Sequence, residues 1–263
     1  MILLSDVVLS KNILLTSKNT VILSSSFNSA STSRVVTEMT NLVNNPINSL
    51  FNVPQTPKRD FYLVLISPGG GVNSGLRMLD ALNSLGVNIH VIVFEAASMG
   101  FITTQYLGNR YILRHGTLMS HKMRGGMPAL EFPGQMDSRY NYWKRRSEII
   151  NEQVVKRTEG KQTMKSYDEL IENEYWCQGQ DCVDAGFADE IVGVVCDISL
   201  QVKKIQESSY SFFGSSVKVK SSVSACPLTS GKHIMQVKVD GQIYDYSDTR
   251  LNNFINSVTK EKK

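Results

Sequence analysis

The sequence is poor in the residues that bind metal ions. Its 263 residues include only four cysteines and four histidines. The cysteines all lie in the last third of the chain, without a C-x-x-C spacing and without a histidine placed for zinc: Cys177, Cys182, Cys196 and Cys226. We therefore expect no metal centre and no cofactor. We also expect the four cysteines to be free, buried thiols and not disulfides.

Long apolar runs are also missing. No stretch approaches the roughly 20 residues that are needed to cross a bilayer. The apolar start, MILLSDVVLSKNILL, is interrupted by Asp6 and Lys11 and has no positively charged segment before it, so it is more typical of two strands than of a signal peptide. Together with free thiols, this pattern predicts a cytoplasmic protein that does not contact a membrane.

The chain has no strong charge of either sign. It carries 28 basic and 24 acidic residues, and its only tight basic run is the terminal Lys260, Lys262 and Lys263. This balance does not predict nucleic-acid binding. With 41% hydrophobic residues, the length suits one large domain, or one domain with a small appendage.

The order of apolar segments predicts an α/β fold. Short β-type runs at 13–15 and 21–23 come before a helical pattern over 31–43 and a proline-containing loop over 44–60. From Phe61 onward, apolar strands alternate with helices: strands at 62–66, 89–94 and 111–119, and helices at 73–85 and 98–107. Such alternation is typical of a parallel sheet covered by helices.

Two later segments differ from this pattern. The longest helical pattern, 134–158, is polar over most of its circumference, which favours a projecting or partner-contacting helix. After residue 200 the composition shifts to Ser and Lys, so we expect a main domain over 1–200 and a small α+β extension over 201–263. In the extension, 233–246 predicts a hairpin that turns at Asp240-Gly241, followed by a helix over 249–258.

One glycine-rich turn could bind a ligand. Ser67-Pro68-Gly69-Gly70-Gly71 follows a buried strand and precedes a helix. Glycines there let backbone N–H groups approach a ligand, as an oxyanion hole requires. Because no Gly-Lys-Ser/Thr follows, a phosphate loop is disfavoured. A plain strand-to-helix turn explains this segment, taken alone, equally well.

Ser98 and His121 are the residues best placed for nucleophilic chemistry. Ser98 lies where a buried strand meets a helix, and His121 directly follows the next strand. A histidine at one strand end can reach a serine at a neighbouring strand end and act as its general base. Each has a structural alternative, a helix N-cap for the serine and a packed side chain for the histidine. His115 competes for the same role, but it falls within the strand.

Four motifs in order make a resemblance specific. They are Ser67-Pro68-Gly69-Gly70, Ala96-Ala97-Ser98-Met99-Gly100, His121 with Gly125-Gly126, and Gly186-Phe187-Ala188-Asp189-Glu190-Ile191. In this order the chain resembles the proteolytic subunit of the Clp protease family. The resemblance covers roughly residues 30–195. It implies a fold of the Clp and crotonase-like type, with stacked βαβ units.

The resemblance also implies roles for individual residues. Ser98 would be the nucleophile and His121 its general base. The backbone N–H groups of Gly69 and Met99 would bind the oxyanion. The main chain at three glycines would pair with an extended substrate: Gly70, Gly125 and Gly126.

The acidic member of the triad is where this sequence departs from the family. The family's aspartate falls on Glu174, whose carboxylate could accept the Nδ1–H of the histidine but reaches further by one methylene. Asn173, Glu172 and Asp181 remain alternatives.

The resemblance implies a serine endopeptidase that cleaves unfolded polypeptides inside a chamber of stacked homo-oligomeric rings. The chain has no nucleotide-binding loop, so ATP dependence would come from a partner unfoldase; the helix over 134–158 would join two rings. Two alternatives share the motifs: a phage-type processing peptidase for capsid maturation, and an inactive scaffolding subunit. A crotonase-type acyl-CoA enzyme shares the fold, but it would not need the serine and histidine pair.

Overall fold

The computed structural model describes residues 11–45, 60–124, 133–201, 204–212, 215–229, 232–239 and 242–245. The chain divides into two compact units, Met1–Val195 and Cys196–Lys263. The division lies close to residue 200, where the sequence predicts the end of the main domain. The predicted loop over 44–60 falls almost entirely outside the described residues.

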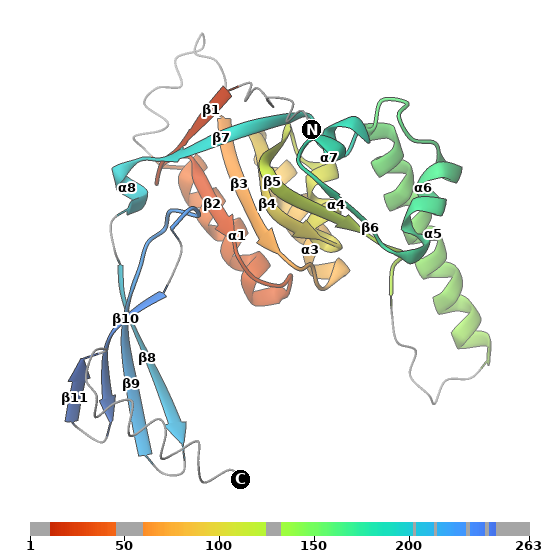
Figure 1. The fold of residues 1–263 in the computed structure, drawn as a ribbon. Helices are drawn as coiled ribbons and strands as arrows, with labels where there is room; N and C mark the ends of the chain where they lie inside the picture. The colour runs from red at the N-terminus through yellow and green to blue at the C-terminus, as the bar shows by residue number, and fades with distance from the viewer. Residues whose placement is uncertain are drawn as a thin grey trace, which may run out of the picture. The chain divides into compact units, whose positions relative to one another are not determined.

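The first unit is built on a seven-stranded sheet (Figure 1). Its strands are β1 (Lys11–Leu15), β2 (Thr20–Leu23), β3 (Asp60–Ser67), β4 (Asn88–Ala97), β5 (Arg110–Ser120), β6 (Tyr175–Gln178) and β7 (Glu190–Cys196). The order is β1-β7-β5-β4-β3-β2, with β6 paired antiparallel to β5. The neighbours from β2 to β5, and β5 with β7, run parallel. This confirms the predicted α/β class.

Helices connect the strands of this sheet. They are α1 (Ser29–Val43), α3 (Val72–Asn83), α4 (Met99–Tyr106), α5 (Pro133–Arg157), α6 (Met164–Leu170) and α7 (Gln180–Asp184), with a 3-10 turn η1 (Ile171–Asn173). The first four match the predicted helices within a few residues. Strand β6 and helices α6 and α7 were not predicted, because elements of four to seven residues are too short for a clear periodicity.

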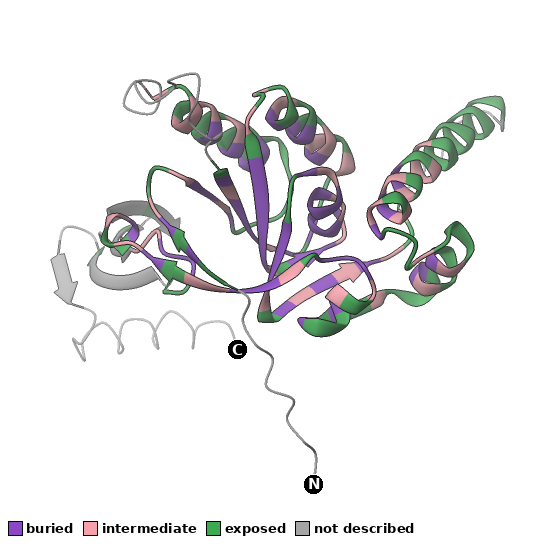
Figure 2. Cartoon of the chain, turned by 90° about the horizontal axis from the view of Figure 1, so that it is seen from above, coloured by how far each residue is buried: buried purple, intermediate pink, exposed green. Residues whose placement is uncertain are grey.

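The core lies on both sides of the central strands. Leu63, Leu65, Val91 and Val93 are fully buried, in keeping with the apolar stretches in the middle of β3 and β4. Each such side chain contributes about 1.5–3 kcal/mol through burial. Figure 2 shows these strands in the buried colour and the solvent side of the helices in the exposed colour. A rigid sheet of this kind fixes the positions of the loops at its strand ends.

Helix α5 differs from the others in its exposure. It is 25 residues long, and most of its side chains are exposed, including Tyr140 (57%) and Tyr142 (53%). Only near its C-terminal end do Ile150 and Val154 enter the core. Figure 2 shows the long helix exposed over most of its length. Within the described residues, no helix is long and apolar enough to cross a membrane.

The second unit contains a four-stranded antiparallel sheet and a short helix, α8 (Ile198–Gln201). Its strands are β8 (Lys204–Phe212), β9 (Ser215–Val223), β10 (Lys232–Val239) and β11 (Gln242–Asp245), in the order β11-β10-β9-β8. Val239 stands opposite Gln242, so β10 and β11 form a hairpin. The turn residues Asp240-Gly241 and the predicted helix over 249–258 lie outside the described residues.

The prediction of four free thiols is wrong. Cys177 is bonded to Cys182, and Cys196 to Cys226. Their Cα atoms are 5.2 and 5.8 Å apart, within the normal range for disulfides. Sequence spacing alone did not show that β6 and α7 turn back on each other at Gly179, a residue with φ of 48°.

Candidate active site

Ser98 stands on a sharp turn between β4 and α4. Its φ is 54° and its ψ is −113°, a conformation that non-glycine residues adopt rarely. Its N–H donates to the carbonyl of Met119 on β5 at 2.8 Å, which holds the turn against the neighbouring strand. Although Ser98 occupies the N-cap position of α4, its side chain makes no capping hydrogen bond. The hydroxyl is therefore available to another partner.

That partner is His121, the first residue after β5. Its Nε2 lies 2.9 Å from Ser98 Oγ. Its Nδ1 lies 2.6 Å from the carbonyl oxygen of Lys122. Because a carbonyl only accepts hydrogen bonds, the proton is on Nδ1, and Nε2 is left as the acceptor for the Ser98 hydroxyl. This is the tautomer that a general base requires.

The glycine-rich turn packs directly against Ser98. Gly69 has φ of 98°, and a Cβ on it would lie 2.6 Å from Ser98 Cβ, so no larger residue fits. The turn is also held by Phe27, whose N–H donates to the Gly69 carbonyl and whose carbonyl accepts from Gly71, each at 2.8 Å. The structure therefore brings together the turn, the serine and the histidine that the sequence singled out.

The two proposed oxyanion donors differ in their present partners. The N–H of Gly69 donates to Ser67 Oγ at 3.2 Å, a long hydrogen bond. Met99 is the first residue of α4, so its N–H has no carbonyl partner within the helix. Both groups belong to segments that adjoin Ser98. Gly125 and Gly126, expected to bind substrate, lie outside the described residues.

In the part of the chain that the structure describes, no carboxylate is bonded to His121. Glu174 Oε1 instead accepts a hydrogen bond from Arg124 at 2.7 Å. Glu172 pairs with Lys122, and neither Asn173 nor Asp181 contacts His121 among the described residues. Among the described residues, the Nδ1–H of His121 donates only to the backbone carbonyl of Lys122. Glu174, like the three alternatives, therefore lies off the imidazole in this conformation.

Tyr167 supports the site, although no sequence pattern singled it out. It is 2% exposed, and its hydroxyl lies 2.7 Å from Ser120 Oγ. Ser120 is the residue directly before His121 in the chain. Burial raises the pKa of Tyr167 to about 12, although the hydrogen bond to Ser120 acts in the opposite direction. The phenol therefore stays neutral and holds the end of β5. Its only sequence signal is the capping pair of Thr163 and Ser166, which begins α6.

The closing motif has a structural role that can be read from its contacts. Asp189 accepts hydrogen bonds from the N–H of Arg110 at 2.7 Å and from Arg110 Nε at 3.0 Å. Arg110 is 3% exposed and also donates to the Gly186 carbonyl at 2.8 Å. Burial alone would raise the pKa of the Asp189 carboxyl, but hydrogen bonds and charge from Arg110 outweigh it and lower that pKa. The motif thus anchors the start of β7 to β5.

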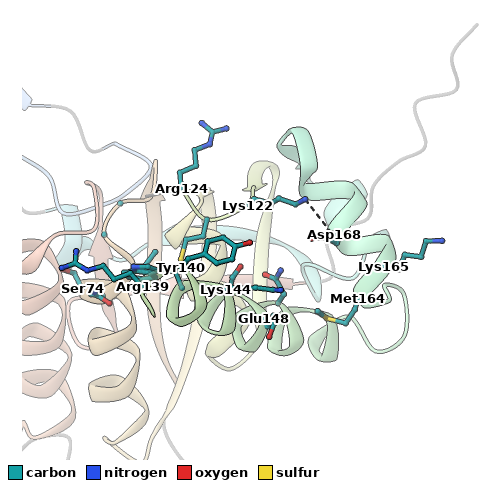
Figure 3. A pocket seen from close by; sticks show the side chains of 18 residues that line it. Ser74, Lys122, Arg124, Arg139, Tyr140, Lys144, Glu148, Met164, Lys165 and Asp168 are labelled. Carbon is teal, nitrogen blue, oxygen red and sulfur yellow. Dashed lines mark ion pairs between the residues drawn. The ribbon is translucent and has the colours of Figure 1, made fainter. Parts of the chain in front are cut away.

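A cleft of about 1050 Å³ opens beside these residues (Figure 3). It is bordered by the start of α3, the segment after β5, and helices α5 and α6. A smaller cavity of about 70 Å³ contains Ser98 and His121. Gly70, Met123 and Arg124 line both spaces, so the cleft leads to the serine. Among the described residues, no cluster of three or more His, Cys, Asp or Glu could hold a metal ion.

Comparison with known proteins identifies the family. Residues 9–195 match the model of the Clp protease family. The ATP-dependent Clp protease proteolytic subunits of Streptococcus suis and Streptococcus mutans are each 31% identical to the chain over 147 residues, which are 54% of this chain and 74% of each relative. That of Streptococcus pyogenes serotype M1 is 30% identical over 156 residues, or 58% and 79%. This chain belongs to the Clp protease family and is a peptidase by descent.

Proposed function

We propose that the chain is a serine endopeptidase with Ser98 as nucleophile and His121 as general base. The observation that supports this best is the 2.9 Å contact between Ser98 Oγ and His121 Nε2. The contact occurs at a strained turn whose serine does not cap its helix. A serine that is held out of its capping role and bonded to a correctly protonated imidazole is suited to nucleophilic attack.

The proposed reaction uses two covalent steps. Ser98 Oγ attacks the peptide carbonyl while Nε2 of His121 takes the hydroxyl proton, and the same nitrogen then returns that proton to the leaving amine. Water then attacks the acyl-enzyme in the same way: His121 takes a proton from the water and returns it to Ser98 Oγ as the acid product leaves. We assign the oxyanion hole to the N–H groups of Gly69 and Met99. An oxyanion is a stronger acceptor than the Ser67 hydroxyl, so it would displace that long bond from Gly69.

We propose that the substrate is an extended, unfolded polypeptide bound through its main chain. Phe27 bonds to Gly69 and Gly71, which flank Gly70. Because successive residues of an extended segment direct their N–H and C=O groups to opposite sides, those of Gly70 face away from Phe27. Gly70 also lines the cavity with Ser98. Such pairing would recognise the main chain of the substrate and depend little on its amino-acid sequence. We assign Gly125 and Gly126 to the same role.

We further propose that the chain forms stacked homo-oligomeric rings and receives substrate from an ATP-driven unfoldase. The exposed aromatic side chains of α5, including Tyr140 and Tyr142, supply apolar surface for contact between rings. The proposed setting is the cytoplasm, as the sequence predicts. The cytoplasm keeps most thiols reduced, whereas the structure contains two disulfides. Measuring whether these four cysteines are oxidised in the protein therefore tests the proposed setting.

Labelling with a fluorophosphonate probe tests the central proposal. The probe should label the purified protein and fail to label Ser98→Ala, with loss of peptide cleavage in the same variant. One second candidate is supported by a specific observation: Glu174 is bonded to Arg124 and not to His121, as in a subunit that keeps the fold without turnover. Absence of both labelling and cleavage in the assembled wild-type protein would favour that scaffolding role over the peptidase.

A further inference from the structure

Glu174 is close to the position that a triad acid needs. Strand β6 pairs antiparallel with β5, and the last pair in this register is Ser120 with Tyr175. The next residue on each side is His121 and Glu174. The Cα atoms of such an antiparallel pair are about 4.5–5.5 Å apart. Glu174 has φ of 71° and lies just before β6, so the strand register ends before it. The backbone nevertheless keeps Glu174 near His121 in space, and its side chain is directed to Arg124.

Arg124 is the group that holds this side chain. Its guanidinium bonds Glu174 at 2.7 Å, and the two side chains are 73% and 35% exposed, respectively. An ion pair with this much solvent exposure is weak. Another carboxylate could replace Glu174 on the guanidinium at little cost, because one charged hydrogen bond would be exchanged for another.

His121 gains from such an exchange. In the present state its Nδ1–H donates to the neutral Lys122 carbonyl. That contact selects the tautomer, but it stabilises the imidazolium formed during the reaction less than a carboxylate would. Glu174, once released, is the acid placed to accept the Nδ1–H.

The location of Arg124 shows which carboxylate could replace Glu174. Arg124 lines the small cavity of Ser98 and His121 as well as the large cleft. Figure 3 shows its side chain on the segment that follows β5, near Lys122, which is joined to Asp168. Lys122 is also paired with Glu172, so among the described residues it has two acidic partners while Arg124 has one. A peptide in the cleft can therefore present a carboxylate to Arg124 close to the scissile bond.

We propose that Arg124 is a positioning residue that exchanges Glu174 for an Asp or Glu side chain of the substrate. The exchange frees Glu174 to orient His121, so peptides with an acidic residue near the scissile bond are cleaved fastest. This inference depends on the proposed peptidase function and adds a substrate class to it. It predicts an effect on kcat, whereas simple attraction between charges would lower KM alone.

The experiment uses the full-length protein and matched fluorogenic peptides. Each pair carries Glu or Gln at one of three positions on either side of the cleavage site. For the wild type, kcat at the best position should be about fivefold higher with Glu than with Gln, which is the range expected when one exposed ion pair is replaced. Arg124→Gln should raise kcat for the Gln peptide by a similar factor and bring the ratio close to one.

Two further variants separate this exchange from other charge effects. Glu174→Gln should abolish the difference in kcat and leave at most a difference in KM. Lys18→Gln removes one positive charge from the turn between β1 and β2, outside the cleft, and should keep the wild-type preference. Thermal unfolding of every variant shows whether each one is folded.

Equal kcat values for both peptides in the wild type would overturn the inference, as would an unchanged preference in Arg124→Gln. Fluorophosphonate labelling keeps this result separate from the proposed function. A protein that is labelled at Ser98 but shows no acidic preference is a peptidase without the Arg124 exchange. A protein whose Ser98 is never labelled contradicts the peptidase itself.

Discussion

Ser98 Oγ and His121 Nε2 are 2.9 Å apart although the residues are 23 positions apart in the chain. The sheet explains this convergence. Ala97 at the end of β4 pairs with Met119 near the end of the parallel strand β5. The residues that follow the two strands therefore emerge at the same edge, where Ser98 also bonds to the Met119 carbonyl. The pair is a property of neighbouring strand ends and not of any local motif.

Replacing His121 should remove most of the activity without unfolding the protein. In His121→Ala the Ser98 hydroxyl loses its base, and kcat should fall by about 10⁶, as in serine proteases that lose the triad histidine. His115→Ala is the matched control, because His115 is an exposed histidine on β5, the strand that leads to His121. Steady-state kinetics on a short peptide measures both variants. Comparable losses in the two would contradict the assignment of His121.

Gly69 should tolerate no side chain. A Cβ there would lie 2.6 Å from Ser98 Cβ and 2.7 Å from the Ala97 carbonyl oxygen, so Gly69→Ala should displace the turn and lower kcat by about 10²–10³, the cost of losing an oxyanion donor. Gly86→Ala is the control. Gly86 also has positive φ, 67°, but nothing lies within 4 Å of its added Cβ.

The control variant should lose about 1–2 kcal/mol of stability from backbone strain and keep its kcat. Peptide kinetics and thermal unfolding separate the two effects. If Gly69→Ala turned over peptide like the wild type, the turn would not form the oxyanion hole.

The Arg110–Asp189 pair should make stability depend on acidity. The pKa of Asp189 is lowered in the folded protein, so the unfolded chain, whose aspartates have pKa values near 3.9, binds its proton first on acidification. The stabilisation is complete above that unfolded value and is lost as the pH falls through the lower folded value. Urea unfolding at pH values from 7 to 3 should show the decline.

Asp189→Asn should flatten the part of this decline that comes from Asp189. At pH 7 the variant should be about 2–3 kcal/mol less stable than the wild type, because the buried Arg110 guanidinium loses its charged partner. A variant that matched the wild type at every pH would show that the pair does not stabilise the fold.

The cysteine pairs predict the number of reactive thiols. Protein purified under a thiol-blocking reagent should have no free thiol, because all four cysteines are bonded in the structure. Breaking Cys196–Cys226 by Cys226→Ser should destabilise the second unit by about 3–4 kcal/mol, the entropy of a closed loop of this length. Mass spectrometry counts blocked cysteines. Four alkylated thiols would restore the original prediction of a reduced protein.

Much of the fold could be predicted from periodicity. The strands over 62–66 and 89–94 are almost wholly apolar because helices cover both faces of a parallel sheet, whereas 111–119 is apolar mainly at its two ends. The shorter elements β6 and α6 left no such pattern, yet α6 carries Tyr167 and Glu174 directly precedes β6. Their positions depend on pairing with β5 and on packing against Phe187, which are contacts between residues far apart in the chain.

The sequence by itself determined the residue types and their order: a glycine turn, a serine after one strand and a histidine after the next. Those are local features, fixed by backbone conformation and by strand length. Only the tertiary structure decided which side chains meet. Ser98 is hydrogen-bonded to His121 because their strands end side by side. Glu174 is bonded to Arg124, and the four cysteines form two disulfides. Which charged groups and which thiols pair with one another depends on their distances in the folded protein, and these distances cannot be read from the spacing of residues in the sequence.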